Sequence, residues 1–208
     1  MKSTISAGIA AVMLLVLAAC AKPPTEQIDI AEKAVKDAQQ SGASAYTPQD
    51  YAKLEGMLAN AKKEVADQDT KFALLRDYGK AEQLAASTKA EAERVKGEVA
   101  KKKEEAKTAA LQAQQVAQEA VKATQGLVAK APVGKDRAAL EAIKADAEGL
   151  TKSLGEVQTA IDGGDYLAAQ AKAKAIHEKS QAVSAEIQNA LAKISAAKGK
   201  HTQPKKGK

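Results

Sequence analysis

The chain has 208 residues and contains 48 alanines, no tryptophan, one phenylalanine and one cysteine. Alanine is the strongest helix former, whereas strands favour β-branched and aromatic residues, so this composition excludes a β-rich fold and predicts an all-α protein. The net charge is +6, but acids and bases balance from Ala21 to Glu186, and the six lysines after Glu186 are unopposed. So few aromatic residues could stack on bases that nucleic acid is not expected as a partner.

The first residues have the organisation of an export signal. Lys2 precedes an apolar run from Ile5 to Leu17, which is too short to span a bilayer. The small residues Ala18 and Ala19 follow, and then comes Cys20, the only cysteine. We therefore expect residues 1–19 to be a signal peptide that is removed.

The sequence Leu17-Ala18-Ala19-Cys20 resembles the lipobox of bacterial lipoproteins. The resemblance implies that the Cys20 thiol receives a diacylglyceryl group and that the new amino terminus is acylated as well. Each buried methylene contributes about 0.8 kcal/mol, so two or three acyl chains anchor a protein almost permanently. Ala21, in place of an aspartate, implies the periplasmic face of the outer membrane in a Gram-negative cell.

Residues 20–25 form the predicted tether, because Pro23 and Pro24 favour a short extended spacer. A first helix is predicted from about Glu26 to Gln40, ending at the sequence Ser41-Gly42-Ala43-Ser44. Its apolar face is formed by Ile28, Ala31, Val35 and Ala38.

The second predicted helix begins with Thr47 as N-cap, Pro48 at the first position and Asp50 in the first turn. The seam positions, apolar except for Gln68, then follow in steps of three and four, as in a coiled coil: Tyr51, Leu54, Leu58, Ala61, Val65, Gln68, Phe72 and Leu75. The chain is expected to reverse at 76–79, with Asp77 capping the next helix; a turn at 67–70 is the alternative.

The third predicted helix is the longest, and about fifty residues would make a rod of roughly 75 to 80 Å. Its predicted seam consists of Ala81, Ala85, Thr88, Ala92, Val95, Val99, Lys102, Ala106, Ala109, Ala113, Val116, Ala120, Ala123 and Leu127. The charged stretch 101–105 interrupts this seam, so we expect it to be the least covered part. The sequence Pro132-Val133-Gly134 should end the helix.

Two further helices are predicted, and Asp162-Gly163-Gly164 separates them. The fourth has its seam at Leu140, Ile143, Ala147, Leu150, Leu154, Val157 and Ile161. Asp165 caps the fifth, whose seam is Tyr166, Ala169, Ala173, Ile176, Ser180, Val183, Ile187, Ala190 and Ile194. Residues 198–208 have no apolar stripe and are expected to be a disordered basic tail.

The two halves of the chain repeat at an offset of 86 residues, where Val35, Lys36 and Leu54 match Val121, Lys122 and Leu140. With two residues' slip, Asp77-Tyr78 matches Asp165-Tyr166. The predicted fold is an elongated antiparallel helical bundle or coiled-coil rod, in which two three-helix units, 26–115 and 116–197, share one long central helix. Its architecture resembles that of spectrin-type rods; a run of independent helices is the alternative.

Few residues could carry catalytic or metal chemistry. His177 and His201 stand alone, without a cysteine or second histidine at ligand spacing, so no metal or cofactor is expected. Glu91 and Glu93 are two apart on a helix and point in different directions, as solvating charges do. The protein is therefore predicted not to be an enzyme.

The lipobox, the alanine-rich heptads and the pattern Asp77-Tyr78, Ala81, Leu84-Ala85 resemble a family of alanine-rich helical bacterial envelope lipoproteins. The domain of that family has no assigned function, and in some relatives it precedes a peptidoglycan-binding domain like that of outer membrane protein A. The chain is also similar to the major outer-membrane (Braun) lipoprotein, although its terminal Lys206-Gly207-Lys208 departs from the Tyr-Arg-Lys through which that protein joins peptidoglycan.

The expected function is that of a structural or spacer lipoprotein between the outer membrane and the cell wall. The lipid would anchor one end, and the tail, a solubilising terminus in the alternative, would contact peptidoglycan or another polyanion through Lys198, Lys200, Lys205, Lys206 and Lys208. The alternative function is a periplasmic adaptor or chaperone-like module that binds another envelope protein through its helical seams or the charged stretch 101–105. Self-association through the seams is also plausible.

Overall fold

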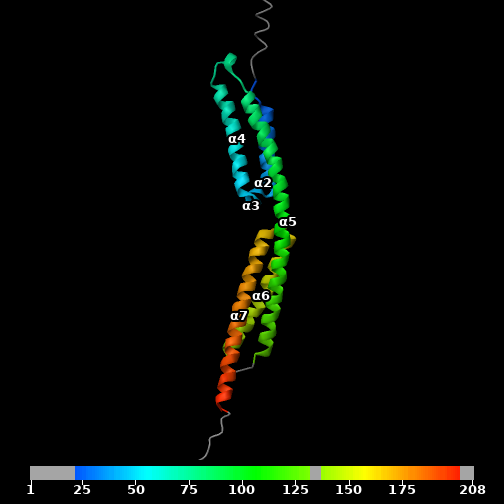
Figure 1. The fold of residues 1–208 in the computed structure, drawn as a ribbon, viewed down its shortest axis with the longest axis vertical. Coiled ribbons are helices and arrows are strands. Elements are labelled where there is room, and N and C mark those ends of the chain that lie inside the picture. Colours follow the sequence, from blue (N-terminus) through cyan, green and yellow to red (C-terminus); the bar gives the residue numbers. More distant parts are fainter. Residues whose placement is uncertain (1–21, 132–136, 202–208) are drawn as a thin grey trace, which may run out of the picture. The chain divides into compact units, whose positions relative to one another are not determined.

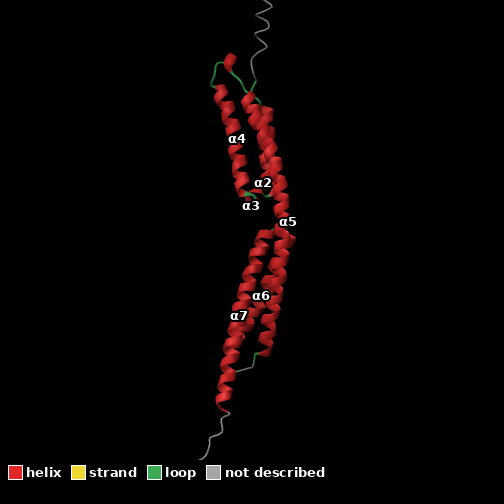
Figure 2. Ribbon diagram, in the orientation of Figure 1, coloured by secondary structure: helices red, strands yellow, loops and turns green. Residues whose placement is uncertain are grey.

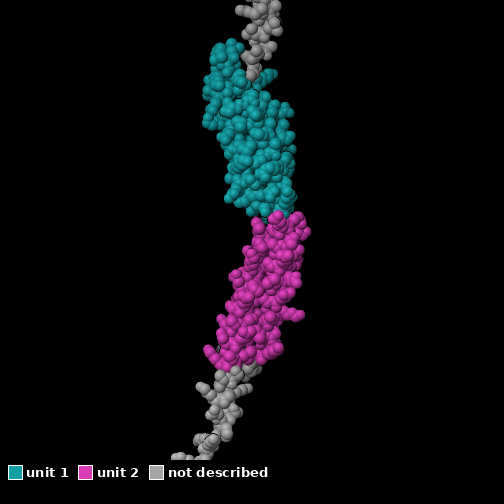
Figure 3. Space-filling model, viewed as in Figure 1, with its two compact units in different colours: residues 1–102 teal, residues 103–208 magenta. Residues whose placement is uncertain are grey.

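The computed structural model describes residues 22–131 and 137–201, which contain six α-helices, one short 3-10 turn and no strand (Figure 2). The predicted all-α class is confirmed. The chain divides into two compact units, residues 1–102 and 103–208 (Figure 3). This division lies inside the charged stretch 101–105, earlier than the boundary expected at 115/116. The predicted signal peptide, Cys20, Ala21 and the sequence Pro132-Val133-Gly134 lie outside the described residues.

Unit 1 packs three helices side by side: α2 (Thr25–Ser41), α4 (Pro48–Asp69) and the first part of α5 (Gly79–Lys130) (Figure 1). Helix α2 ends at Gly42, where the predicted stop is confirmed. Gly42 has φ +105°, and a side chain there would be strained and would lie 3.2 Å from the Tyr46 ring. The additional turn α3 (Ala43–Tyr46), which the sequence pattern did not predict, then leads into α4.

Thr47 occupies the predicted N-cap position of α4, and Pro48 is the first helical residue. The Thr47 hydroxyl does not cap the helix, however. It donates to the carbonyl oxygen of Ala43 at 3.2 Å, because α3 places that acceptor one turn before it. Asp50 lies in the first turn, as predicted.

Helix α4 ends earlier than its apolar seam. Leu54, Ala61 and Gln68 are buried, but Phe72 and Leu75 are 70% and 71% exposed. The prediction that the seam continues to Leu75 is therefore wrong, and the helix stops at Asp69, at the alternative turn. A connection of residues 70–78, with the 3-10 turn Ala73–Leu75, then leads to α5.

The core of unit 1 consists mainly of small side chains. It is formed by Ala34, Val35, Ala38, Ala43, Leu54, Ala92, Val95 and Val99. Tyr46, Tyr51 and Leu58 cover its edge. Because most of these residues are alanine or valine, the helix backbones can pack closely, and Leu54 is the largest fully buried side chain.

Unit 2 contains the rest of α5 with α6 (Arg137–Asp162) and α7 (Tyr166–His201). The predicted turn between α6 and α7 is confirmed: Gly163 and Gly164 close it, and the Asp165 carboxylate accepts the Ala168 N–H at 3.2 Å. The core consists of Ala110, Ala117, Val121, Leu150, Val157, Ile161, Ala169, Ala173 and Ile176. Helix α7 continues to His201, so the first four residues of the predicted disordered tail are helical; residues 202–208 lie outside the described ones.

The seam of α5 changes register after the charged stretch. Up to Val99 the buried residues are those predicted, and Ala106 is buried as well. Beyond it the buried side chains are Ala110, Gln114, Ala117, Val121 and Thr124, each one residue later than predicted. The residues predicted for this part of the seam are half-buried or exposed, and Val116 is 47% exposed. An α-helix drifts by about 20° per heptad against a strict seven-residue repeat, so five heptads displace the seam by about one residue.

The internal repeat reproduces the observed burial better than the heptad pattern. The offset of 86 residues maps buried Ala31 and Val35 onto buried Ala117 and Val121. At the slipped offset of 88 residues, six buried positions of α5 correspond to six buried positions of α7. These positions are Ala81, Ala85, Thr88, Ala92, Val95 and Val99 in α5, and Ala169, Ala173, Ile176, Ser180, Val183 and Ile187 in α7.

Candidate functional surfaces

The residues predicted to carry function lie at the two ends of the sequence. Cys20 and the lipobox residues Leu17, Ala18 and Ala19 lie outside the described residues. So do Lys205, Lys206 and Lys208 of the tail. Lys198 and Lys200 belong to the last turns of α7. The structure therefore leaves the lipid attachment and the polyanion contact as predictions.

The described parts of the chain hold no group of three or more His, Cys, Asp or Glu side chains that could bind a metal ion. His177 is half-buried, and its Nε2 lies 3.0 Å from the Gln181 amide nitrogen. His201 is the last residue of α7. Among the helices that the structure describes, none is long and apolar enough to cross a membrane.

Three ion pairs cross the interface between α4 and α5 in unit 1. Lys53 Nζ lies 2.8 Å from Glu91 Oε1, and Lys80 Nζ lies 2.6 Å from Glu64 Oε2. Arg94 Nη2 lies 3.1 Å from Asp50 Oδ1. From one pair to the next, the residue number on α5 falls by as much as the residue number on α4 rises. Helices α4 and α5 are therefore antiparallel, and their register is the same at all three pairs.

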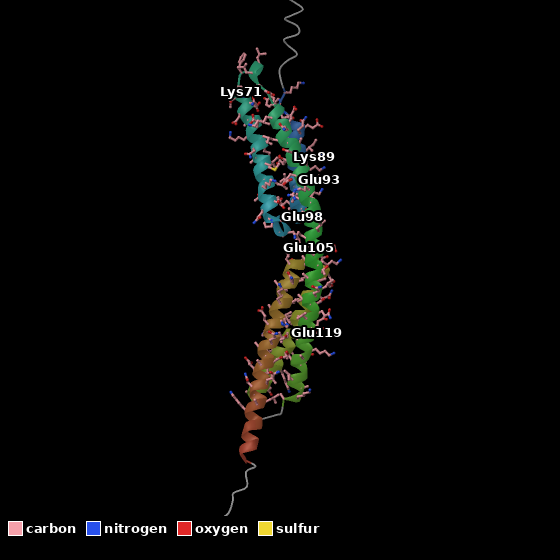
Figure 4. All side chains as sticks on the ribbon, viewed as in Figure 1. Lys71, Lys89, Glu93, Glu98, Glu105 and Glu119 are labelled. Atoms are coloured by element: carbon pink, nitrogen blue, oxygen red, sulfur yellow. The ribbon has the colours of Figure 1, made fainter. Side chains whose placement is uncertain are left out.

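Glu91 has the most perturbed carboxylate of this interface. Arg94 and Lys53 both donate hydrogen bonds to it, and they lower its pKa from 4.5 to about 2. Its side chain is 17% exposed. The sequence-based interpretation of Glu91 as solvating charge is therefore wrong, because the carboxylate joins two helices. Glu93, labelled in Figure 4, instead pairs with Lys96 on its own helix.

The charged stretch 101–105 is exposed, as predicted, except that Lys103 is half-buried. One of its exposed side chains, Glu105, is labelled in Figure 4. Lys102, Lys103 and Glu105 each have interaction partners.

In unit 2, α5 meets its neighbours through uncharged polar groups. Thr124 is fully buried, and its hydroxyl lies 2.8 Å from the Ser184 hydroxyl and 3.1 Å from the Ser180 carbonyl oxygen. Gln114 donates to Gln158 of α6 at 2.8 Å. Sequence reasoning did not find these contacts, because it placed the neighbours of Gln114 and Thr124 in the seam.

A shallow groove lies between α5 and α7, with a volume of about 410 Å³. Val116, Ala120 and Ala123, which the heptad pattern assigned to the core, line it together with Glu119, which is labelled in Figure 4. On the α7 side, the Ser180 hydroxyl and His177 Nδ1 are buried without a hydrogen-bond partner. The accessible lining of the groove is thus mainly apolar, and these two polar atoms are buried behind it.

The connection between α4 and α5 presents large apolar side chains to solvent. Phe72, Leu74 and Leu75 are 70%, 56% and 71% exposed, the largest values among the exposed large hydrophobic residues of the described chain. Heptad spacing had placed Phe72 and Leu75 in a seam and so concealed this surface.

Comparison with protein-family models, with curated proteins and with solved structures finds no match to this chain.

Proposed function

We propose that the protein is a non-enzymatic lipoprotein of the bacterial outer membrane that acts as a spacer or structural element towards the cell wall. The observation that carries the proposal is the lipobox-like sequence ending at Cys20, five residues before the first helical residue Thr25. A helical bundle that begins so close to its lipid is held at the membrane surface. The likeness to alanine-rich envelope lipoproteins supports the same assignment.

The anchor is tested by expressing the full chain in a Gram-negative host with a radiolabelled fatty acid. The proposal expects label on the wild-type protein, none on Cys20→Ser, and recovery of the wild type with the outer membrane. A wild-type protein without label would reject the lipid anchor.

The cell-wall contact in this proposal is assigned to the basic C-terminal residues 198–208, which carry five lysines and no acid. Polyanion binding by such a segment is electrostatic and weakens with salt. Deleting these residues should abolish salt-sensitive sedimentation with purified peptidoglycan. Unchanged sedimentation would show that the tail is only a solubilising terminus.

A second candidate function, a periplasmic adaptor, is supported by the groove between α5 and α7. Its mainly apolar lining suits the apolar face of an amphipathic helix of another envelope protein. In-cell cross-linking followed by muramidase digestion separates the two functions. Cross-links mainly to the cell wall favour the spacer, and cross-links to one defined protein, lost in Ala120→Glu, favour the adaptor.

A further inference from the structure

The most exposed large apolar side chains of the described chain are neighbours in sequence. Phe72, the only phenylalanine, is 70% exposed, and Leu74 and Leu75 are 56% and 71% exposed. We call residues 72–75 the apolar loop. Soluble proteins rarely expose several large apolar residues together without a partner, so this loop needs an explanation.

Polar contacts hold the apolar loop in its conformation, so its exposure does not result from fraying. The Arg76 side chain donates to the carbonyl oxygens of Asp69 and Lys71, at 2.9 and 3.0 Å. The Gln68 amide oxygen accepts the Asp77 N–H at 3.1 Å. Within the loop, Leu75 N–H donates to Phe72 O at 2.8 Å. These contacts shape a turn whose apolar side chains point outward.

The apolar loop lies at the end of unit 1 where α2 begins. Lys62 of α4 pairs with Glu32 of α2 at 2.8 Å, and following these antiparallel helices from that pair puts Thr25 level with Asp69. Residues 72–75 come after Asp69 and therefore extend beyond this level. Figure 1 shows the start of α2 beside the connection from α4 to α5, and Figure 4 labels Lys71 there.

The chain between the proposed lipid and the fold is short. Pro24 is already buried, so only the steps from Cys20 to Pro24 can separate the bundle from the lipid. Four residues span at most about 14 Å even when they are fully extended. A lipid on Cys20 would thus hold this end of unit 1, and the apolar loop with it, at the membrane surface.

We propose that the apolar loop inserts into the interfacial region of the same bilayer that holds the Cys20 lipid. The inference rests on the proposed lipid anchor. Phe72, Leu74 and Leu75 would leave water for the headgroup–acyl boundary, where aromatic and leucine side chains are favoured. The loop then gives unit 1 a second attachment, which fixes the orientation of its helices at the membrane.

A tryptophan introduced into the loop can report its depth, because the chain has none. The full chain from Cys20 onward, carrying Phe72→Trp, is coupled through the Cys20 thiol to a maleimide lipid in phosphatidylethanolamine–phosphatidylglycerol vesicles. The emission maximum of the introduced tryptophan should lie at a shorter wavelength than it does in solution. Lipids brominated on their acyl chains should reduce the tryptophan fluorescence intensity about twofold. Leu75→Trp should show the same shift and the same quenching. Leu111→Trp, at a side chain 45% exposed on α5, is the control and should show neither the shift nor the quenching.

The chemical coupling supplies an anchor whether or not cells lipidate Cys20, so this test can fail while the lipoprotein assignment stands. Loop tryptophans that brominated lipids do not quench would overturn the inference. A shift to shorter wavelength that grows with protein density, again without such quenching, would also overturn it and would indicate contact with a second copy. Combining Phe72→Ser, Leu74→Ser and Leu75→Ser should reduce vesicle binding of the Cys20→Ser chain about tenfold or more, without lowering its thermal stability.

Discussion

In unit 1 two of the three carboxylates in ion pairs across the interface between α4 and α5 are largely covered, whereas those across the corresponding α6–α7 interface of unit 2 are exposed. The Glu64 and Glu91 side chains are 13% and 17% exposed, but Glu156 and Asp146, which pair with Lys172 and Lys179, are 55% and 50% exposed. Covered ion pairs are screened less by solvent. Both units have a core of small apolar side chains, and they differ in how far the carboxylates between their helices are covered.

The connections between the paired helices also differ between the two units. Three residues, Gly163, Gly164 and Asp165, join α6 to α7, whereas residues 70–78 join α4 to α5. Since the tight turn suffices to reverse the chain, the longer connection and its exposed apolar side chains are not needed for the reversal. The membrane contact proposed for the apolar loop would account for this difference.

The largest expected effect comes from the core of unit 1. Leu54→Ala removes the largest fully buried side chain and should lower the free energy of unfolding by about 2–5 kcal/mol. Hydrogen exchange should show that amides of α2 and α4 lose protection more than those of α6. Equal loss of amide protection in both units would mean that they unfold together. Leu58→Ala, at the edge of the core, is the control and should lower the free energy of unfolding by less than Leu54→Ala does.

The register of α5 is tested in unit 2 by two neighbouring substitutions. Ala117→Gln places a polar side chain in a fully buried position and should cost about 2–3 kcal/mol, whereas Val116→Gln should stay within about 0.5 kcal/mol. Thermal or urea unfolding measures both. A larger loss of stability for Val116→Gln than for Ala117→Gln would support the heptad register instead.

The hydroxyl network of unit 2 should contribute a smaller amount. Thr124→Val keeps the shape but leaves the Ser184 hydroxyl and the Ser180 carbonyl without the Thr124 partner, at a cost of about 1–2 kcal/mol. Urea unfolding measures this cost. Thr159→Val, at an exposed hydroxyl that bonds only to Gly155 O in its own helix, is the control and should be nearly neutral. Equal costs for the two variants would contradict a role for the network.

The smallest effect is electrostatic and confined to unit 1. The pKa of Glu91 is lowered from 4.5 to about 2, so its ion pairs stabilise the folded state above pH 4.5 and are lost as the pH falls towards 2. Glu91→Gln should lower the free energy of unfolding by about 1 kcal/mol at pH 7. The variant should also lose less stability than the wild type as the pH falls from 4.5 to 2. Glu93→Gln is the matched control, and an unchanged pH profile for Glu91→Gln would contradict the assignment.

The sequence by itself determined which segments are helical and where most of them stop. Alanine content predicts the helices, Gly42 and Gly163-Gly164 end α2 and α6, and Asp165 caps α7. These are local effects of backbone conformation and capping, which need no partner. The repeat aligned Val121 with Val35, but the sequence left open whether the seam of α5 follows the repeat or the heptads.

Only the tertiary structure decided which of two adjacent alanine-rich stripes on α5 is buried. Apolar residues stand at Ala109 and Ala110, at Val116 and Ala117, and at Ala120 and Val121, so either stripe could form a seam. The position of α6 and α7 selects the later one. Similarly, Phe72 and Leu75 continue the heptad spacing, but α4 stops at Asp69 and leaves them exposed. Burial depends on where neighbouring helices lie, and periodicity along one helix does not contain that information.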